Sequence, residues 1–134
     1  RQKNTDNLLM LKYKYTIAWG VWVLIIFILC LISGKEMPDA PRIPYLDKVV
    51  HFGFYFGYTV LFIVSFGKET QAVKSAKKLN LWAFVSAFIL GGTIELLQGW
   101  LTTTRSADPM DMVFNTFGII VALLFMTRYK ELFR

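Results

Sequence analysis

Hydrophobic residues gather in four segments, at about residues 15–33, 47–67, 80–101 and 109–127. Each segment is close to the roughly 20 apolar residues that an α-helix needs to cross the hydrocarbon core of a bilayer. Backbone amides and carbonyls cannot be left unpaired in lipid, so the segments are predicted to be helices. The pattern therefore predicts an all-α, polytopic membrane protein with four transmembrane helices, forming a single domain over residues 1–134.

Polar residues interrupt this pattern mainly at one set of helix ends. They are Asp47, Lys48, His51, Glu95, Gln98, Arg105, Asp108, Asp111 and Asn115. Because ionisable residues are costly inside a membrane, they usually serve a function or pair with one another. The distribution predicts one polar site on one face of the membrane.

Composition supports a membrane protein, and the distribution of charge predicts its orientation in the membrane. The chain is 55% hydrophobic, which fits lipid as its main solvent, and its formal net charge is +6. Basic residues concentrate before the first segment, in the second loop and after the last segment, so the positive-inside rule predicts that both termini are cytoplasmic. The polar site then faces outward, to the periplasm or the cell exterior. No basic element suited to nucleic acid accompanies the charge, so no nucleic-acid partner is expected.

The second segment begins with a polar stripe. Asp47, His51 and Tyr55 recur at steps of four, which places them on one helix face. Asp47 is suited to capping the helix, and Lys48 to reaching the membrane interface. His51 can exchange protons with outside water or hydrogen-bond another helix. The same segment carries a Gly-x-x-x-Gly pair, typical of close helix packing, at Gly53 and Gly57.

Glu95 is the strongest single candidate for a functional residue, because it lies inside an otherwise uncharged apolar segment. A carboxylate there must be paired, protonated or in contact with water. Gln98 lies one turn further on the same face, and Gly91 one turn back leaves room for a neighbouring helix or a ligand.

The fourth segment begins with clear sequence signals for a helix N-terminus. Asp108 and Pro109 form a helix cap followed by a first-position proline, and Asp111 suits the first turn because the helix dipole favours negative charge there. Asp111 and Asn115 share one face that runs inward to about the depth of Glu95. Arg105 precedes this start and can neutralise the acids or bind an anion.

Three motifs occur in order along the chain: Asp47-Lys48-x-x-His51-Phe52-x-x-Tyr55, then Glu95-x-x-Gln98, then Asp111-x-x-x-Asn115-x-x-Gly118. Together with Arg105 they resemble the VanZ-like family of small bacterial membrane proteins, over nearly the whole chain from the second helix onward. The resemblance implies a multi-helix membrane protein linked to teicoplanin resistance, and so a glycopeptide or lipid-linked envelope precursor as a partner. It implies no agreed reaction.

Three classes of function stay open. The first is a recognition module that binds an anionic membrane lipid or lipid-linked envelope molecule. Its ligand-binding candidates are Asp47, Lys48, Tyr55, Gln98, Arg105 and Asn115. The second is a membrane enzyme acting on a lipid or envelope precursor, and the third is a structural or assembly subunit that docks another membrane protein.

The enzyme class has its own candidate residues. The catalytic candidates are His51, Glu95 and Asp111. His51 would act as general base or nucleophile, oriented by Asp47 or Asp111, while Arg105 steadies developing negative charge. A metal site built from the three catalytic candidates is conceivable, but no metal-ligand spacing occurs within one helix, so neither a metal nor another cofactor is expected.

Overall fold

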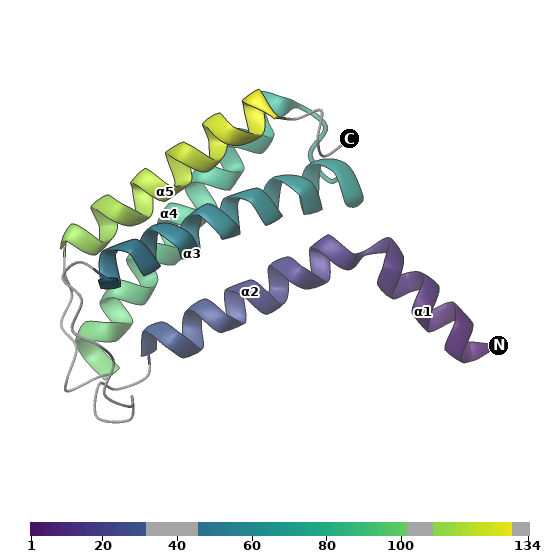
Figure 1. Ribbon diagram of the computed structural model, residues 1–134, viewed down its shortest axis with the longest axis horizontal. Coiled ribbons are helices and arrows are strands. Elements are labelled where there is room, and N and C mark those ends of the chain that lie inside the picture. The colour runs from purple at the N-terminus through teal and green to yellow at the C-terminus, as the bar shows by residue number, and fades with distance from the viewer. Residues whose placement is uncertain (32–45, 102–108, 130–134) are drawn as a thin grey trace.

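The computed structural model of the protein is a bundle of helices (Figure 1) and describes residues 1–31, 46–101 and 109–129. In chain order the helices are α1 (Gln2–Lys12), α2 (Lys14–Leu31), α3 (Leu46–Ile63), the π-helix η1 (Val64–Glu69), α4 (Ala76–Leu101) and α5 (Pro109–Arg128). Four spans are long and apolar enough to cross a membrane: α2, α3 with η1, α4 and α5. The predicted all-α class with four membrane-length helices is confirmed.

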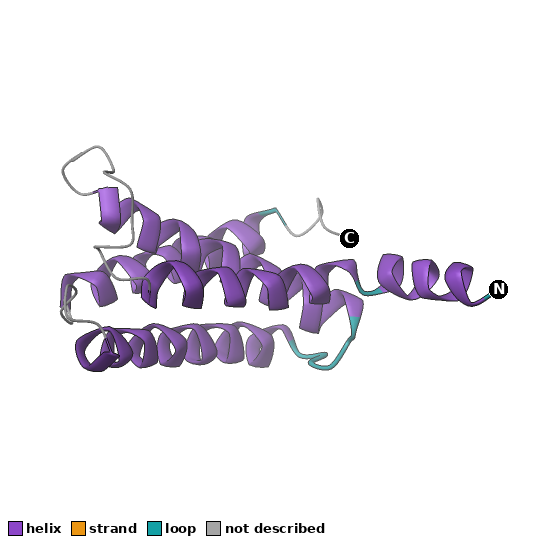
Figure 2. Ribbon diagram, turned by 90° about the horizontal axis from the view of Figure 1, so that it is seen from below, coloured by secondary structure: helices purple, strands orange, loops and turns teal. Residues whose placement is uncertain are grey.

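Two features were not predicted from the hydrophobic pattern: the π geometry at the end of the segment expected over residues 47–67, and the helix α1. The π-helix η1 directly follows α3 and carries the second span on to Glu69. The helix α1 precedes the first span, and it projects beyond the bundle in both views (Figures 1 and 2). All its residues are exposed. Its first half is polar, so no apolar stripe marked it as a helix.

The helix α3 lies between α2 and α5, with α4 behind them (Figure 1). Its closest approach to α5 is at Gly118, where an added Cβ would lie 2.5 Å from the carbonyl oxygen of Phe52. On the α2 side, a Cβ at Gly57 would lie 2.8 Å from the ring of Trp22, whereas one at Gly53 would have nothing within 4 Å. Within the described residues, only the second glycine of the predicted Gly-x-x-x-Gly pair packs against another helix.

Hydrogen bonds between side chains and backbone also join the helices. The indole of Trp22 donates to the carbonyl oxygen of Phe54 at 2.8 Å, which links α2 to α3. The hydroxyl of Tyr58 donates to Ser86 at 3.0 Å, which links α3 to α4. Large apolar side chains stay exposed on the outer faces of the four long helices, as expected for surfaces that contact lipid; examples are Leu24, Val49, Leu96 and Leu124.

The two ends of the bundle differ in which helices begin there. In Figure 1, α3 and α5 both begin at the end opposite to the start of α2. The start of α2 lies against η1, because the Glu69 carboxylate accepts hydrogen bonds from the backbone amides of Tyr15 and Thr16 at 2.8 and 3.4 Å. The first turns of α3 and α5 therefore share one end, and this is where the predicted polar residues meet.

Candidate functional site

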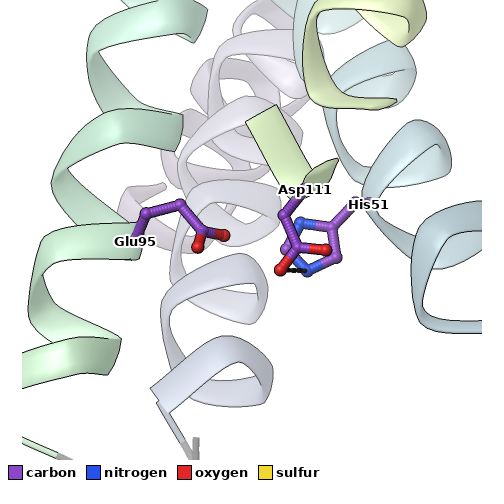
Figure 3. A group of neighbouring side chains, drawn as sticks. All are labelled: His51, Glu95 and Asp111. Atoms are coloured by element: carbon purple, nitrogen blue, oxygen red, sulfur yellow. Dashed lines mark ion pairs between the residues drawn. The ribbon is translucent and has the colours of Figure 1, made fainter. Parts of the chain in front are cut away.

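Three ionisable side chains from three helices converge inside the bundle (Figure 3). His51 comes from α3, Glu95 from α4 and Asp111 from α5, and each side chain is buried. One ligand-type atom of each residue lies within 4.8 Å of those of the other two. We call these three residues the triad. The sequence placed them on separate helices, and the fold brings them together.

Lys48 supplies a positive charge next to the triad. Its ammonium nitrogen, Nζ, lies 2.5 Å from Oδ1 of Asp111 and 3.1 Å from Oδ2 of Asp47. The Lys48 side chain is only 11% exposed, so it does not simply extend into the membrane interface. Asp47 lies in the first turn of α3, which begins at Leu46, and its side chain is largely exposed. Lys48 is thus held between two carboxylates.

The imidazole of His51 has a defined neighbour on each side. Nδ1 lies 3.0 Å from Oδ1 of Asn115, and Nε2 lies 3.5 Å from Oδ2 of Asp111. The Asn115 amide nitrogen donates to the sulfur of Met112 at 3.8 Å, which agrees with its amide oxygen facing His51. Since an amide oxygen can only accept, Nδ1 carries a proton and Nε2 points toward the carboxylates.

Gln98 and Tyr55 contribute in different ways. The Gln98 amide donates to the backbone carbonyl of Cys30 at 2.7 Å, so it ties α4 to the end of α2. Tyr55 is fully buried, and within the described residues its hydroxyl has no hydrogen-bond partner. That hydroxyl is within electrostatic range of Glu95 and Asp111. Tyr55 therefore presents a polar group beside the triad.

Gly91 makes room for this arrangement. A Cβ at Gly91 would lie 3.0 Å from the amide nitrogen of Asn115 and 3.5 Å from the ring of Tyr55. A larger side chain here would push Asn115 and Tyr55 from their positions next to the triad. This agrees with the prediction that Gly91 leaves space for a neighbouring helix.

A cavity of about 330 Å³ adjoins His51 between α2 and α3. Leu29, Leu46, Val50 and Phe54 give it largely apolar walls, while Asp47 and His51 form its polar part. The cavity connects an apolar surface with the polar cluster, which suits a molecule that has both an apolar chain and a polar group.

Sequence reasoning missed some of the residues around the triad. Met112 and the wall of the cavity carry no polar signal, although Met112 lies one turn before Asn115 on the same helix face. Arg105 and Asp108, both predicted near the site, lie outside the described residues.

The described helices and their polar cluster define a class of protein: a multi-pass membrane protein whose buried histidine and carboxylates lie near one end of the bundle. A family model described as VanZ/LLP1 matches residues 5–133. The chain therefore belongs to the VanZ/LLP1 family.

A curated relative extends this comparison to a eukaryote. The chain is 32% identical over 111 residues to "Uncharacterized protein C11E3.10" of the fission yeast Schizosaccharomyces pombe. The match covers 81% of this chain and 65% of the yeast protein, so the chain spans slightly less than two thirds of that relative's length. No solved structure matches the chain significantly. Because the relative is eukaryotic, the bacterial origin expected from the sequence stays a prediction.

Proposed function

We propose that the protein is an integral-membrane enzyme that hydrolyses an ester bond of a membrane lipid at the triad. The observation that carries this proposal is the convergence of His51, Glu95 and Asp111 from three helices, with the His51 ring held by Asn115. Buried ionisable groups in a membrane protein are costly unless paired, and they usually mark a functional site. A bundle held together only by packing would not need them.

The cavity next to His51 supports a lipid as the substrate. Its apolar wall can accommodate part of an acyl chain, while His51 and Asp47 face the polar region of the same molecule. Val50, which lines the cavity, and its neighbour Val49 are both exposed, and such an apolar surface is suited to contact with lipid. A lipid can therefore approach the triad from within the membrane, without first leaving it.

The charge of the described cluster favours an enzyme over a site that binds an anionic headgroup. Lys48 is held by Asp47 and Asp111, and Glu95 adds a further acidic side chain. Among the described side chains, the positive charge of Lys48 is therefore already neutralised by carboxylates, and little is left to attract an anion. Recognition of an anionic lipid through Arg105, and a link to teicoplanin, stay predictions from the sequence.

The proposed reaction is the addition of water to the ester group. The water oxygen forms a new bond to the acyl carbon or to phosphorus, and its proton passes to the triad. The bond to the glycerol oxygen then breaks, and the leaving alkoxide takes up a proton from the triad. Positioned acid–base groups of this kind contribute about 10²- to 10⁴-fold to a rate.

The test is a hydrolysis assay with the purified chain in vesicles. The vesicles contain phosphatidylcholine, phosphatidylethanolamine and phosphatidylglycerol, and mass spectrometry follows fatty acid and diacylglycerol. We expect the wild-type protein to release one of these products and His51→Ala to lower the rate at least about 100-fold, because it removes a positioned proton-transfer group. The product identifies the type of ester that is cleaved.

A matched pair of variants controls for charge. Asp111→Asn removes a triad carboxylate, whereas Asp6→Asn makes the same change on α1, beyond the bundle. Asp6→Asn should retain the wild-type rate. The proposal is wrong if folded wild-type protein releases neither product from any of the three lipids, or if folded His51→Ala is as active as wild type. Tight lipid retention without turnover would favour recognition instead.

A further inference from the structure

We infer that the triad binds one divalent metal ion, with Nε2 of His51 and one carboxylate oxygen each of Glu95 and Asp111 as ligands. The three atoms lie within 4.8 Å of one another and come from α3, α4 and α5. This inference deepens the proposed function: with Nε2 of His51 bound to the ion, the ion makes the attacking water acidic and a carboxylate of the triad takes up its proton. It rests on that function only for this consequence. Metal binding itself can be measured without any substrate.

The first argument concerns the space between His51 and Asp111. Nδ1 of His51 lies against Oδ1 of Asn115, so Nε2 is the ring nitrogen that faces Asp111, 3.5 Å from its Oδ2. Two ligand atoms that each lie about 2.1 Å from a tetrahedral ion are about 3.4 Å apart. The spacing of these two atoms therefore suits their binding to one metal ion.

The second argument is the support behind the ligands. A histidine that binds a metal generally donates its other ring N–H to an oxygen, which fixes the tautomer and orients the ring. Asn115 Oδ1 is placed to accept this hydrogen bond, and the contact of the Asn115 amide with Met112 agrees with its orientation. Lys48 similarly occupies Oδ1 of Asp111, which leaves Oδ2 on the His51 side.

The third argument is the hydroxyl of Tyr55. It is fully buried, has no hydrogen-bond partner among the described residues and lies within electrostatic range of Glu95 and Asp111. A water molecule on a metal ion in the triad would give this hydroxyl a partner. The ring of Tyr55 packs in the core of the bundle, whereas its hydroxyl makes no hydrogen bond between the described helices.

The ligand set indicates which metals fit. One imidazole and two carboxylates suit first-row divalent ions such as Mn²⁺ and Zn²⁺, whereas a site for Ca²⁺ is built from oxygen ligands. Ligands about 2.1 Å from a tetrahedral ion are about 3.4 Å apart, so the widest pair of ligand atoms in the triad, up to 4.8 Å apart, has to close by about 1.4 Å. Glu95 has the longest and most adjustable of the three side chains. The remaining coordination positions would hold water, which becomes more acidic on such an ion.

The experiment is a titration of the full chain in detergent, stripped with chelator, with MnCl₂ alone. Electron paramagnetic resonance measures free Mn²⁺, and competition with ZnCl₂ measures zinc affinity. We expect one Mn²⁺ per chain. His51→Ala and Glu95→Gln should each lower the affinity at least tenfold. Asn115→Ala keeps all three ligands and should lower it about 10- to 100-fold, through loss of ring orientation.

Asp6→Asn is the control, and it should bind Mn²⁺ as the wild type does. Circular dichroism and size-exclusion profiles establish that each variant is folded. Wild-type protein that binds neither Mn²⁺ nor Zn²⁺ would overturn the inference. Folded His51→Ala and Glu95→Gln proteins with wild-type affinity would overturn it as well.

The outcomes for metal binding and for hydrolysis are distinguishable. If the protein binds one Mn²⁺ but cleaves no lipid, the inferred metal site stands and the proposed enzymatic function is wrong. If chelator-treated protein cleaves lipid at the full rate and binds neither ion, the proposed enzymatic function stands and the inferred metal site is wrong.

Discussion

Lys48 and Asp111 form an ion pair whose two side chains are 11% and 9% exposed. Removing charges from water costs free energy, and the attraction between the partners offsets this cost only when the geometry is good. A buried pair is therefore weak support for stability, but loss of one partner leaves the other charge uncompensated. The dependence of each partner on the other can be measured.

We expect Lys48→Met to lower the free energy of unfolding by about 3 kcal/mol, because Asp111 stays buried without its cation. The double variant Lys48→Met/Asp111→Asn should recover most of this loss, since both charges are gone. Thermal unfolding in one detergent measures both effects. If the double variant is less stable than either single variant, the two residues do not act as a pair.

Among the helices, α3 and α5 depend on a close backbone approach. The absence of a side chain at Gly118 lets α5 lie against the carbonyl of Phe52. His51 and Lys48 on α3 reach Asn115 and Asp111 on α5 across this same contact. The distance between these two helices therefore sets the geometry of the site.

Gly118→Ala should lower the free energy of unfolding by about 2 kcal/mol, because its Cβ would be 2.5 Å from backbone that cannot rotate away. Gly53→Ala is the matched control. It lies in α3 with nothing within 4 Å and should be neutral or stabilising by up to about 1 kcal/mol, since alanine favours helices. In thermal unfolding, Gly118→Ala should have a lower midpoint temperature than the wild type, whereas Gly53→Ala should not. Equal losses would argue against close packing at Gly118.

The elements could be predicted from the sequence better than their contacts. Lipid imposes length and apolarity on each span, so the four long helices were readable to within a few residues. The helix α1 lacked such a constraint, and the hydrophobic pattern does not distinguish the π geometry of η1 from an α-helix. Helical spacing placed Asp111 and Asn115 on one face, but neighbouring helices decide which glycine is packed and which residue meets His51.

For the whole molecule, the described cations are unevenly distributed. Lys48 is the described cation near the triad, whereas the remaining described ones lie on α1, near the start of α2, around the turn between η1 and α4, and at the end of α5. By the positive-inside rule, the end with more basic residues faces the cytoplasm. This charge pattern predicts that the triad lies nearer the outer surface.

Cysteine labelling tests this orientation. In a Cys30→Ala background, Asp47→Cys and Lys74→Cys each place a thiol at an exposed position, at opposite ends of the bundle. We expect a membrane-impermeant maleimide to label the first in intact cells and the second only after the membrane is opened, because the reagent reaches just the outer surface. The reverse pattern would place the triad on the cytoplasmic side.

The carboxylate of Glu69 also has a consequence for the order of assembly. It binds the first amides of α2, although it follows them by more than 50 residues in the chain. During synthesis the chain reaches Glu69 only after all of α2 has been made. The two hydrogen bonds that hold the start of α2 can therefore form only once the second span has been synthesised, so the first span acquires this contact late in assembly.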